Sequence, residues 1–294
     1  MGILVTGATG NVGAHVVTEL LRRGRDVRAF TRDPARAAQR LGSGSEIVQG
    51  DFTDRASLRR AMSGYSLLVL SSSNHPKQAE HEIAVIDEAV EAGVQHVVKL
   101  STVSAEIGSR SAFFDAHGRA EQHLRASGLP HVILQSSFYM TNLFGVAETV
   151  KGLGKIFAPA ADARLSMIDP RDVAAVAAAA LVTDRYDGQV LQLSGPEAIT
   201  YRRVAEVLSE VTGRQVDFIP VPDEVARQNL IANGVPEWFA DQVVILFGLI
   251  RAGAASAVTN TVEKVTGRAA RSLAQFARDF AGVFQPPANE ALPR

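Results

Sequence analysis

Three glycines, each three residues after the last, are the most informative pattern in this chain. Gly7, Gly10 and Gly13 follow a short apolar run at residues 2–6 and open a segment with apolar residues at helical spacing. In a strand–turn–helix of this kind the first glycine permits a tight turn, the second lets the backbone approach a diphosphate, and the third lets helix and strand pack closely. The amides that begin the helix can then bind phosphate oxygens. The pattern predicts a dinucleotide-binding loop; an ordinary strand–helix turn is the alternative.

The end of the second predicted strand bears on which dinucleotide is bound. An acidic residue there would bond both ribose hydroxyls and favour NAD(H), but no acid occupies this strand end and Arg32 follows it. The Arg32 guanidinium could grip a 2′-phosphate through two hydrogen bonds, with Arg36 assisting. Asp33 comes next and could simply start a turn with Pro34. We therefore expect NADP(H) to be preferred, with NAD(H) possible.

Polar residues also end the third and fourth predicted strands. Asp51 could accept a hydrogen bond from an adenine amino group, with the ring of Phe52 nearby, although an aspartate that merely ends a strand is an equal alternative. Ser71, Ser72 and Ser73 follow the fourth strand, at the edge of a Rossmann sheet where ligands lie. Their small side chains would allow a ligand to approach closely.

The usual proton-transfer pair of short-chain dehydrogenases is missing. Those enzymes use Tyr-x-x-x-Lys on one helix, where the lysine lowers the pKa of the tyrosine. The four tyrosines here, at 65, 139, 186 and 201, are followed four positions later by Val69, Leu143, Val190 and Ala205. Alcohol dehydrogenase or sugar epimerase activity by that mechanism is therefore not expected.

His117 is the candidate general acid. Glu121 lies one helical turn further on, where its carboxylate could orient the imidazole and hold its proton. A solvated helix face, or a histidine that only bonds a ribose hydroxyl, is an equal alternative. Ser101 and Thr102 end the fifth predicted strand, where a hydroxyl could orient a substrate oxygen or could simply finish the strand.

Composition excludes several classes of protein. Without cysteine there is no disulfide framework, thiolate nucleophile or cysteine-ligated metal, and we expect no metal site. A net charge of −1 provides no field that would draw the chain to nucleic acid or an anionic membrane. No serine stands in Gly-x-Ser-x-Gly, and no His-Glu-x-x-His occurs.

The elements that must position these residues alternate along the first half of the chain. Short apolar runs predict strands at residues 3–6, 26–30, 46–49, 66–70, 96–100 and 131–135. Amphipathic segments predict a first helix that stops at Gly24, and helices at 57–62, 79–92 and 113–127. This order predicts an α/β fold, a Rossmann-type doubly wound parallel sheet with helices on both faces.

After residue 136 the rhythm becomes irregular. We expect a helix at 172–182, a strand at 189–194, a helix capped by Thr200, a strand at 216–221, two helical stretches leading to Thr259 and a final helix at 271–283. The predicted organisation is a dinucleotide-binding core at 1–136, a segment at 137–284 that completes the sheet and forms a smaller C-terminal α/β substrate cap, and a loose tail at 285–294.

The expected setting is the cytoplasm. No apolar run approaches the ~20 residues that span a bilayer, and cleavage of the first residues as a leader would remove the glycine loop. The expected partner is a small-molecule substrate, with no nucleic acid and no membrane, in a chain that acts as a monomer or homodimer.

Four stretches in order resemble the NmrA-like group of atypical short-chain dehydrogenases/reductases, which includes type-2 quinone oxidoreductases, dye reductases and a redox-sensing regulator. They are TGATGNVG at 6–13, HGRAE at 117–121 leading to GLP at 128–130, SFYMTN at 137–142, and LSGPE at 193–197 with PVP at 220–222. The likeness therefore covers nearly the whole chain and is more specific than the glycine loop alone.

The resemblance implies roles for individual residues. The pyrophosphate would contact residues of the loop, namely Thr9, Gly10, Asn11 and Val12. Arg32 would read the 2′-phosphate, and residues 71–73 would border the nicotinamide ribose. Phe138 and Tyr139 would flank the nicotinamide or the substrate. His117 stands where some relatives place a cofactor-binding or proton-donating lysine.

Two functions fit these residues. The first is an NADPH-dependent reductase of quinones, azo compounds, dyes or similar conjugated, electron-poor compounds, because hydride transfer from the cofactor needs no strong proton relay. The second is a non-catalytic NAD(P)-binding redox sensor that reports to a protein partner. The altered Tyr-x-x-x-Lys position does not discriminate between them.

Overall fold

A computed structural model describes residues 1–286 of the chain. The chain forms two compact units. Unit 1 comprises residues 1–136, 170–193 and 261–268, and unit 2 comprises 137–169, 194–260 and the segment that begins at 269. Most of the predicted tail, residues 287–294, lies outside the described residues.

Unit 1 is built on a seven-stranded sheet in which every neighbouring pair is parallel. Its strands are β1 (Gly2–Val5), β2 (Val27–Thr31), β3 (Glu46–Gln49), β4 (Tyr65–Leu70), β5 (His96–Thr102), β6 (His131–Ser136) and β8 (Val190–Leu193). They lie in the order β3-β2-β1-β4-β5-β6-β8. The order reverses between β1 and β4, and this switch point is where a doubly wound sheet opens a crevice at its carboxyl edge.

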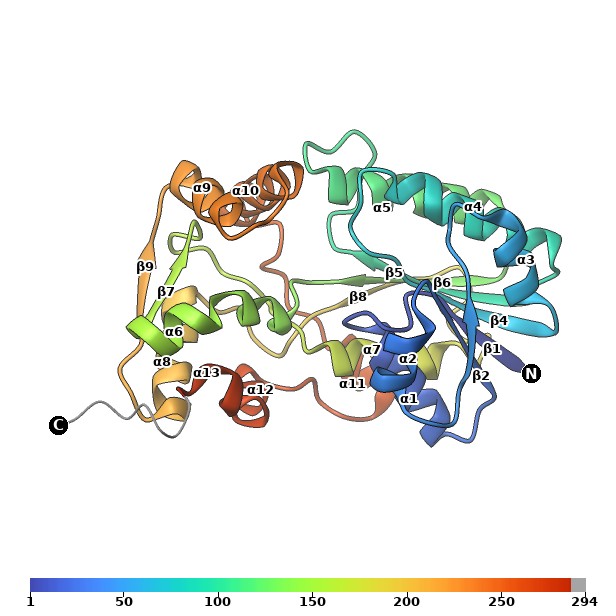
Figure 1. The fold of residues 1–294 in the computed structure, drawn as a ribbon, viewed down its shortest axis with the longest axis horizontal. Helices are drawn as coiled ribbons and strands as arrows, with labels where there is room; N and C mark the ends of the chain where they lie inside the picture. The colour runs from blue at the N-terminus through green and yellow to red at the C-terminus, as the bar shows by residue number, and fades with distance from the viewer. Residues whose placement is uncertain (287–294) are drawn as a thin grey trace. The chain divides into compact units, whose positions relative to one another are not determined.

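Helices cover both faces of this sheet. They are α1 (Gly13–Arg22), α2 (Pro34–Leu41), α3 (Arg55–Met62), α4 (Gln78–Glu91), α5 (Ala112–Ala126), α7 (Pro170–Ala180) and α11 (Thr261–Thr266). The helices α3, α4 and α5 pack side by side on one face, and α1, α7 and α11 pack on the other (Figure 1). The central strands are buried on both sides, which explains why their sequences are almost continuously apolar.

The predicted fold class is confirmed. All six strands predicted for the first half of the chain are present, with ends that differ by one or two residues. Thr200 caps α8 (Tyr201–Thr212) as expected, since its side chain accepts from Arg203 N. Sequence reasoning missed α2, a mostly exposed helix of eight residues whose apolar stripe is short, with Ala37 buried and Pro34 and Leu41 half-buried on one side.

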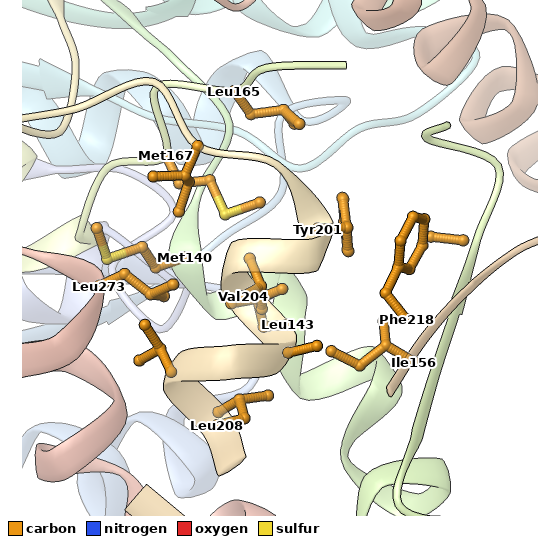
Figure 2. Packing of buried hydrophobic residues seen from close by; sticks show 14 of the residues in the cluster. Met140, Leu143, Ile156, Leu165, Met167, Tyr201, Val204, Leu208, Phe218 and Leu273 are labelled. Atoms are coloured by element: carbon orange, nitrogen blue, oxygen red, sulfur yellow. The ribbon is translucent and has the colours of Figure 1, made fainter. Parts of the chain in front are cut away.

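Unit 2 combines a two-stranded parallel sheet with helices. Its elements are η1 (Met140–Val146), α6 (Ala147–Leu153), β7 (Lys155–Ala158), α8, β9 (Asp217–Pro220), α9 (Asp223–Ala232), α10 (Glu237–Arg251), α12 (Leu273–Asp279) and α13 (Ala281–Phe284). Figure 2 shows Tyr201 of α8 beside Phe218 of β9, with Val204, Leu208 and Ile156 of β7 in the same cluster. These buried side chains form a core separate from that of unit 1.

The structure of this part of the chain differs from the prediction in three places. The final helix predicted at 271–283 is broken into α12 and α13 at Phe280, whose φ of −114° is not helical. The strand β7 was not predicted, because four residues carry little pattern and β7 pairs with β9, more than fifty residues away along the chain. The second helical stretch expected to lead to Thr259 ends at Arg251.

Candidate functional site

The glycine-rich turn after β1 is closed by its own backbone. Gly7 adopts φ +57°, and its carbonyl oxygen accepts from Gly10 N at 2.8 Å. A Cβ on Gly13 would lie 2.2 Å from the Gly7 carbonyl oxygen, so a side chain there would push α1 away from the turn. Gly10 is exposed, and a Cβ on it would contact only this same oxygen, at 3.0 Å. Gly7 and Gly13 serve the fold, whereas Gly10 keeps a surface of bare backbone open.

The amino end of α1 is suited to an anion. Its N-cap, Val12, supplies no side-chain hydrogen bond, and the first turn carries no acidic residue. The positive end of the helix dipole is therefore not neutralised by a nearby carboxylate. Thr9 is half-buried and Asn11 is exposed beside this helix end. The turn and the helix together form the kind of surface that binds phosphate groups.

Two arginines follow β2, and the aspartate between them is already engaged. Asp33 is the N-cap of α2, and its carboxylate accepts from Arg36 N at 3.0 Å, with Pro34 in the first turn. This is the turn-forming role expected for Asp33, so its carboxylate is not available to read a ribose in the way an acid at a strand end would. Arg32 and Arg36 are exposed.

Asp51 and Phe52 lie just past β3. Asp51 Oδ1 accepts from Thr53 Oγ1 at 2.7 Å and from Thr53 N at 2.8 Å, and these bonds lower the pKa of Asp51. Phe52 stacks on Phe30 with ring centroids 5.8 Å apart. An ionised acceptor thus stands beside a half-buried aromatic ring, and adenine binding by the two remains a prediction.

A threonine hydroxyl ties the ends of β1 and β4 together. Thr6 Oγ1 donates to the Ser71 carbonyl and accepts from Ser71 N, both at 2.9 Å. A Cβ on Gly7 would lie 2.7 Å from the same carbonyl oxygen. Ser71 and Ser72 are half-buried and Ser73 is exposed. The serines thus lie directly beside the glycine-rich turn, at the switch point of the sheet.

A buried ion pair lies behind these serines. Lys99 of β5 and Glu82 of α4 have side chains with no solvent exposure, and Lys99 Nζ is 2.7 Å from Glu82 Oε2. Ser72 Oγ donates to Glu82 Oε1 at 2.5 Å. Burial alone would raise the pKa of Glu82, but Lys99 and, more weakly, His117 hold it below its ordinary value. Glu82 is therefore an ionised carboxylate inside the unit.

His117 joins this network from α5. Lys99 Nζ donates to His117 Nδ1 at 3.1 Å, and His117 Nε2 lies 3.2 Å from Gln78 Nε2. Burial, followed by the charge on Lys99, lowers the pKa of His117 to about 4, although Glu82 offsets part of this effect. His117 is thus neutral at about pH 7, with both ring nitrogens close to buried neighbours. Neither a protonated acid nor a solvated helix face fits this environment.

The predicted pairing of Glu121 with His117 is wrong. The Glu121 carboxylate accepts from Ser101 Oγ at 2.5 Å, from Gln135 Nε2 at 3.0 Å and from Arg125 at 2.9 Å. One helical turn of separation places His117 and Glu121 on the same side of α5. The Glu121 carboxylate nevertheless bonds to Ser101 of β5 and Gln135 of β6 in the sheet beneath. Ser101, predicted to orient a substrate oxygen, uses its only proton in this bond and can otherwise only accept.

Phe138 and Tyr139 belong to unit 2. The Phe138 ring packs edge-on against Phe247, with centroids 6.1 Å apart, and its carbonyl accepts from Ile168 N at 2.9 Å. Tyr139 is half-buried and forms an isolated parallel bridge with Ile168. The roles predicted for them beside a nicotinamide remain predictions.

A hollow of 480 Å³ lies elsewhere in unit 1 and contains none of the predicted residues. It is lined by residues at the amino end of β4, including Tyr65 and Ser66, and by Arg59 of α3. Ligands of doubly wound sheets bind at the carboxyl ends of the strands, where Ser71 lies. The hollow is therefore not the candidate site.

Comparison with known proteins shows to which family the chain belongs. The family model described as "NmrA-like family" matches residues 1–281. The chain belongs to the NmrA-like family. The resemblance seen in its motifs is thereby confirmed.

Curated relatives of this NmrA-like chain match it along nearly its full length. It is 33% identical over 282 residues to an NAD(P)H azoreductase of Xenophilus azovorans, covering 96% of this chain and 99% of that protein. It is 38% identical over 285 residues to a (4-alkanoyl-5-oxo-2,5-dihydrofuran-3-yl)methyl phosphate reductase of Streptomyces griseus subsp. griseus, covering 97% of this chain and 99% of that protein.

Solved structures agree. The NADPH-dependent quinone oxidoreductase of Escherichia coli in complex with NADPH superposes with a TM-score of 0.86 at 27% identity, covering 95% of this chain and 99% of that chain. The Citrobacter sp. triphenylmethane reductase in complex with NADP(H) superposes with a TM-score of 0.85 at 26% identity, covering 94% of this chain and 99% of that chain.

Sequence reasoning missed Thr6, Glu82 and Lys99 in this NmrA-like chain. A signal for Lys99 was present, because it stands between apolar residues in a strand predicted to be buried, where an unpaired charge is too costly. Nothing in the sequence singled out Glu82, since a glutamate in a polar-faced helix is usually solvated.

Residues 1–286 contain neither a candidate membrane-spanning helix nor a candidate metal-binding cluster. No helix there combines the length and apolar character needed to cross a bilayer. No group of three or more histidine, aspartate or glutamate side chains in that range is arranged to hold a metal ion.

Proposed function

We propose that this protein is an NADPH-dependent reductase that transfers hydride to quinones, azo dyes or similar conjugated, electron-poor acceptors. One observation carries most of the weight: an open glycine-rich turn at the switch point, in a chain 33% identical to an NAD(P)H azoreductase across 96% of its length.

Residues at the ends of neighbouring strands of unit 1 match successive parts of the NADPH molecule. The turn at Gly10 and the amino end of α1 would hold the pyrophosphate, because Gly10 has no side chain and the helix end has no competing carboxylate. On the β2 side, Arg32 and Arg36 would bind the 2′-phosphate, and Asp51 with Phe52 would contact the adenine. The nicotinamide half would then extend over the ends of β4 and β5, past residues 71–73.

Bound NADPH would supply the hydride, from C4 of its nicotinamide ring. The protein's own part is to bind and orient the cofactor. We assign the accompanying proton to solvent water, because His117 is neutral and half-buried beside Lys99, and Ser101 already donates to Glu121. Conjugated acceptors suit such a site, since their reduction does not need a strong acid held at one atom.

A steady-state assay with a panel of acceptors tests the proposal. Purified protein is mixed with NADPH and, separately, a benzoquinone, a naphthoquinone, an azo dye, a triphenylmethane dye and an unsaturated lactone phosphate. We expect many turnovers per chain with at least one acceptor, seen as loss of the nicotinamide absorbance, and slower turnover with NADH.

The same assay addresses the sensor alternative. Tight NADPH binding with no turnover across the whole panel would contradict the reductase and favour a cofactor sensor. A reaction that continues after the protein is heat-denatured would identify contaminating metal or thiol as its source.

We further place the protein in the cytoplasm as a monomer or homodimer with a small-molecule substrate. Light scattering coupled to size-exclusion chromatography, with and without NADPH, distinguishes the two oligomeric states. A mass above that of a dimer would contradict this assignment.

A further inference from the structure

The buried ion pair of unit 1 is not explained by stability. Lys99 and Glu82 are both without solvent exposure, and removing two charges from water costs several kcal/mol per ion. Apolar side chains of similar volume would make a core at least as stable. The neighbours of Lys99 in β5 are Val98 and Leu100, and both are buried. A retained charged pair in such a place points to a role beyond packing.

The contacts of the pair lead to one residue at the sheet edge. Lys99 Nζ donates to the Leu100 carbonyl at 3.0 Å and to His117 Nδ1 at 3.1 Å, and it lies 2.7 Å from Glu82 Oε2. These three acceptors match the three protons of an ammonium group. Glu82 Oε1 accepts from Gln78 Nε2 at 3.2 Å and from Ser72 Oγ at 2.5 Å. Ser72 directly follows Ser71, whose backbone bonds Thr6 at the start of the glycine-rich turn.

The bond to Glu82 determines what Ser72 can recognise. A serine hydroxyl has one proton, and an ionised carboxylate can only accept, so the Ser72 proton is committed to Glu82. The Ser72 oxygen can then only accept from a ligand. The nicotinamide half of a dinucleotide offers two kinds of donor in this region, a ribose hydroxyl and the carboxamide amino group.

We infer that Glu82 and Lys99 are positioning residues: they hold Ser72 as a hydrogen-bond acceptor for a donor group on the nicotinamide half of the bound cofactor. The inference rests on the proposed function. Lys99 keeps Glu82 ionised, Glu82 takes the Ser72 proton, and Ser72 contacts the cofactor. A glutamine at position 82 could donate to Ser72 and reverse this polarity.

Binding measurements on four variants test the inference. Calorimetry gives the Kd for NADPH with wild type, Ser72→Ala, Glu82→Gln, the double variant and Glu88→Gln. Glu88 is the matched control, because it is a buried glutamate on the same helix whose partners are Arg55 and Arg59 of α3. A structural role alone would lower the Tm of E82Q and E88Q without separating their affinities.

We expect S72A and E82Q each to raise the Kd by about three- to tenfold, the effect of one lost hydrogen bond. In the S72A background, E82Q should add nothing, because Glu82 acts through Ser72. E88Q should change the Kd by less than about twofold. An E82Q effect that is equally large in the S72A background, an equal effect of E88Q, or no effect of S72A would overturn the inference.

A cofactor analogue identifies the donor. The 3-acetylpyridine analogue of NADPH lacks the carboxamide amino group. If that group is the donor, the analogue binds wild type more weakly and is insensitive to S72A; if a ribose hydroxyl is the donor, S72A weakens both cofactors equally. Either pattern supports the inference.

A replacement variant and the result for wild type keep the test decisive. Should E82Q fail to fold, Lys99→Met with Glu82→Met replaces the whole pair, and the same affinity loss is expected in it. Failure of wild type to bind NADPH at all would contradict the proposed function, whereas normal binding in wild type, S72A and E82Q alike would overturn only this inference.

Discussion

Arg32 follows β2 in an exposed position, and the carboxylate beside it is used to cap α2. Replacing Arg32 with alanine should therefore remove the main cation that can bind a 2′-phosphate. Charge-assisted hydrogen bonds contribute about 1.5–3 kcal/mol each, so the Kd of NADPH should rise roughly ten- to hundredfold while that of NADH changes little.

Arg40→Ala is the matched control for this prediction, because Arg40 is also exposed but lies in the last turn of α2. Calorimetry with both coenzymes measures the difference. Equal losses of NADPH and NADH affinity in R32A would show that Arg32 does not read the 2′-phosphate.

His117 should make the stability of the protein depend on pH. Its pKa is about 4 in the folded chain against 6.5 for an ordinary histidine. Between about pH 6.5 and 4, His117 therefore binds a proton in the unfolded chain but not in the folded chain. The free energy of unfolding should fall as the pH drops through this range. Urea unfolding of wild type and His117→Gln across this range measures the effect.

His81, whose pKa is also lowered by burial, acts in the same direction, so the informative quantity is the difference between wild type and H117Q. The variant should show a shallower loss of stability between about pH 6.5 and 4. Identical slopes would mean that His117 is protonated normally in the folded chain, which would contradict a ring held neutral by partial burial and by Lys99.

Sequence reasoning identified the residues at the strand ends better than it identified their partners. Residues 71–73 do follow β4 directly and Ser101 lies next to the last residue of β5, because position at the end of an apolar run is a local property. That Ser72 bonds Glu82 and Ser101 bonds Glu121 depends on how α4 and α5 rotate over the sheet. The local sequence does not determine that rotation, and for this reason the spacing of His117 and Glu121 predicted the wrong partner for Glu121.

At the scale of elements, two glycines of the turn between β1 and α1 have separate roles: Gly13 is needed for folding and Gly10 for binding. Gly13→Ala places a Cβ 2.2 Å from a backbone oxygen and should prevent normal folding or lower the Tm strongly. Gly10→Ala meets only one atom, at 3.0 Å, and should fold with a modestly lower Tm. Its methyl group occupies the surface proposed for the pyrophosphate, so its NADPH affinity should fall at least tenfold.

Thermal unfolding and calorimetry of the two variants check this pair of expectations. Gly152→Ala is a suitable control, since that position lies in α6 with nothing within 4 Å of the added Cβ. A folded G10A that binds NADPH as wild type does would place the pyrophosphate elsewhere.

Long apolar elements were predictable and short polar ones were not. The central strands β4 and β5 were recognised because burial on both faces requires an apolar run, whereas the edge strand β3, with sequence EIVQ, has only its two middle residues half-buried. The helix α2 has eight residues and only three of them, Pro34, Ala37 and Leu41, lie on its apolar side, so its cap, Asp33 with Pro34, is the clearer signal. A capping signal can therefore reveal a helix whose apolar stripe is too short to stand out in the sequence.

At the scale of the whole molecule, the chain leaves unit 1 after residue 136 and returns twice, for 170–193 and 261–268. The first return supplies β8, which pairs in parallel with β6, and the second supplies α11. The sequence alone shows no Pro- or Gly-rich linker at these crossings, so the interleaving follows from which strand completes the sheet.

The most direct test of the account is titration of purified wild-type protein with NADPH by calorimetry. We predict saturable binding at one site per chain, tighter than that of NADH, with a Tm raised by saturating NADPH because only the folded chain binds it. Absence of heat and of saturation with either coenzyme at millimolar concentration would contradict it.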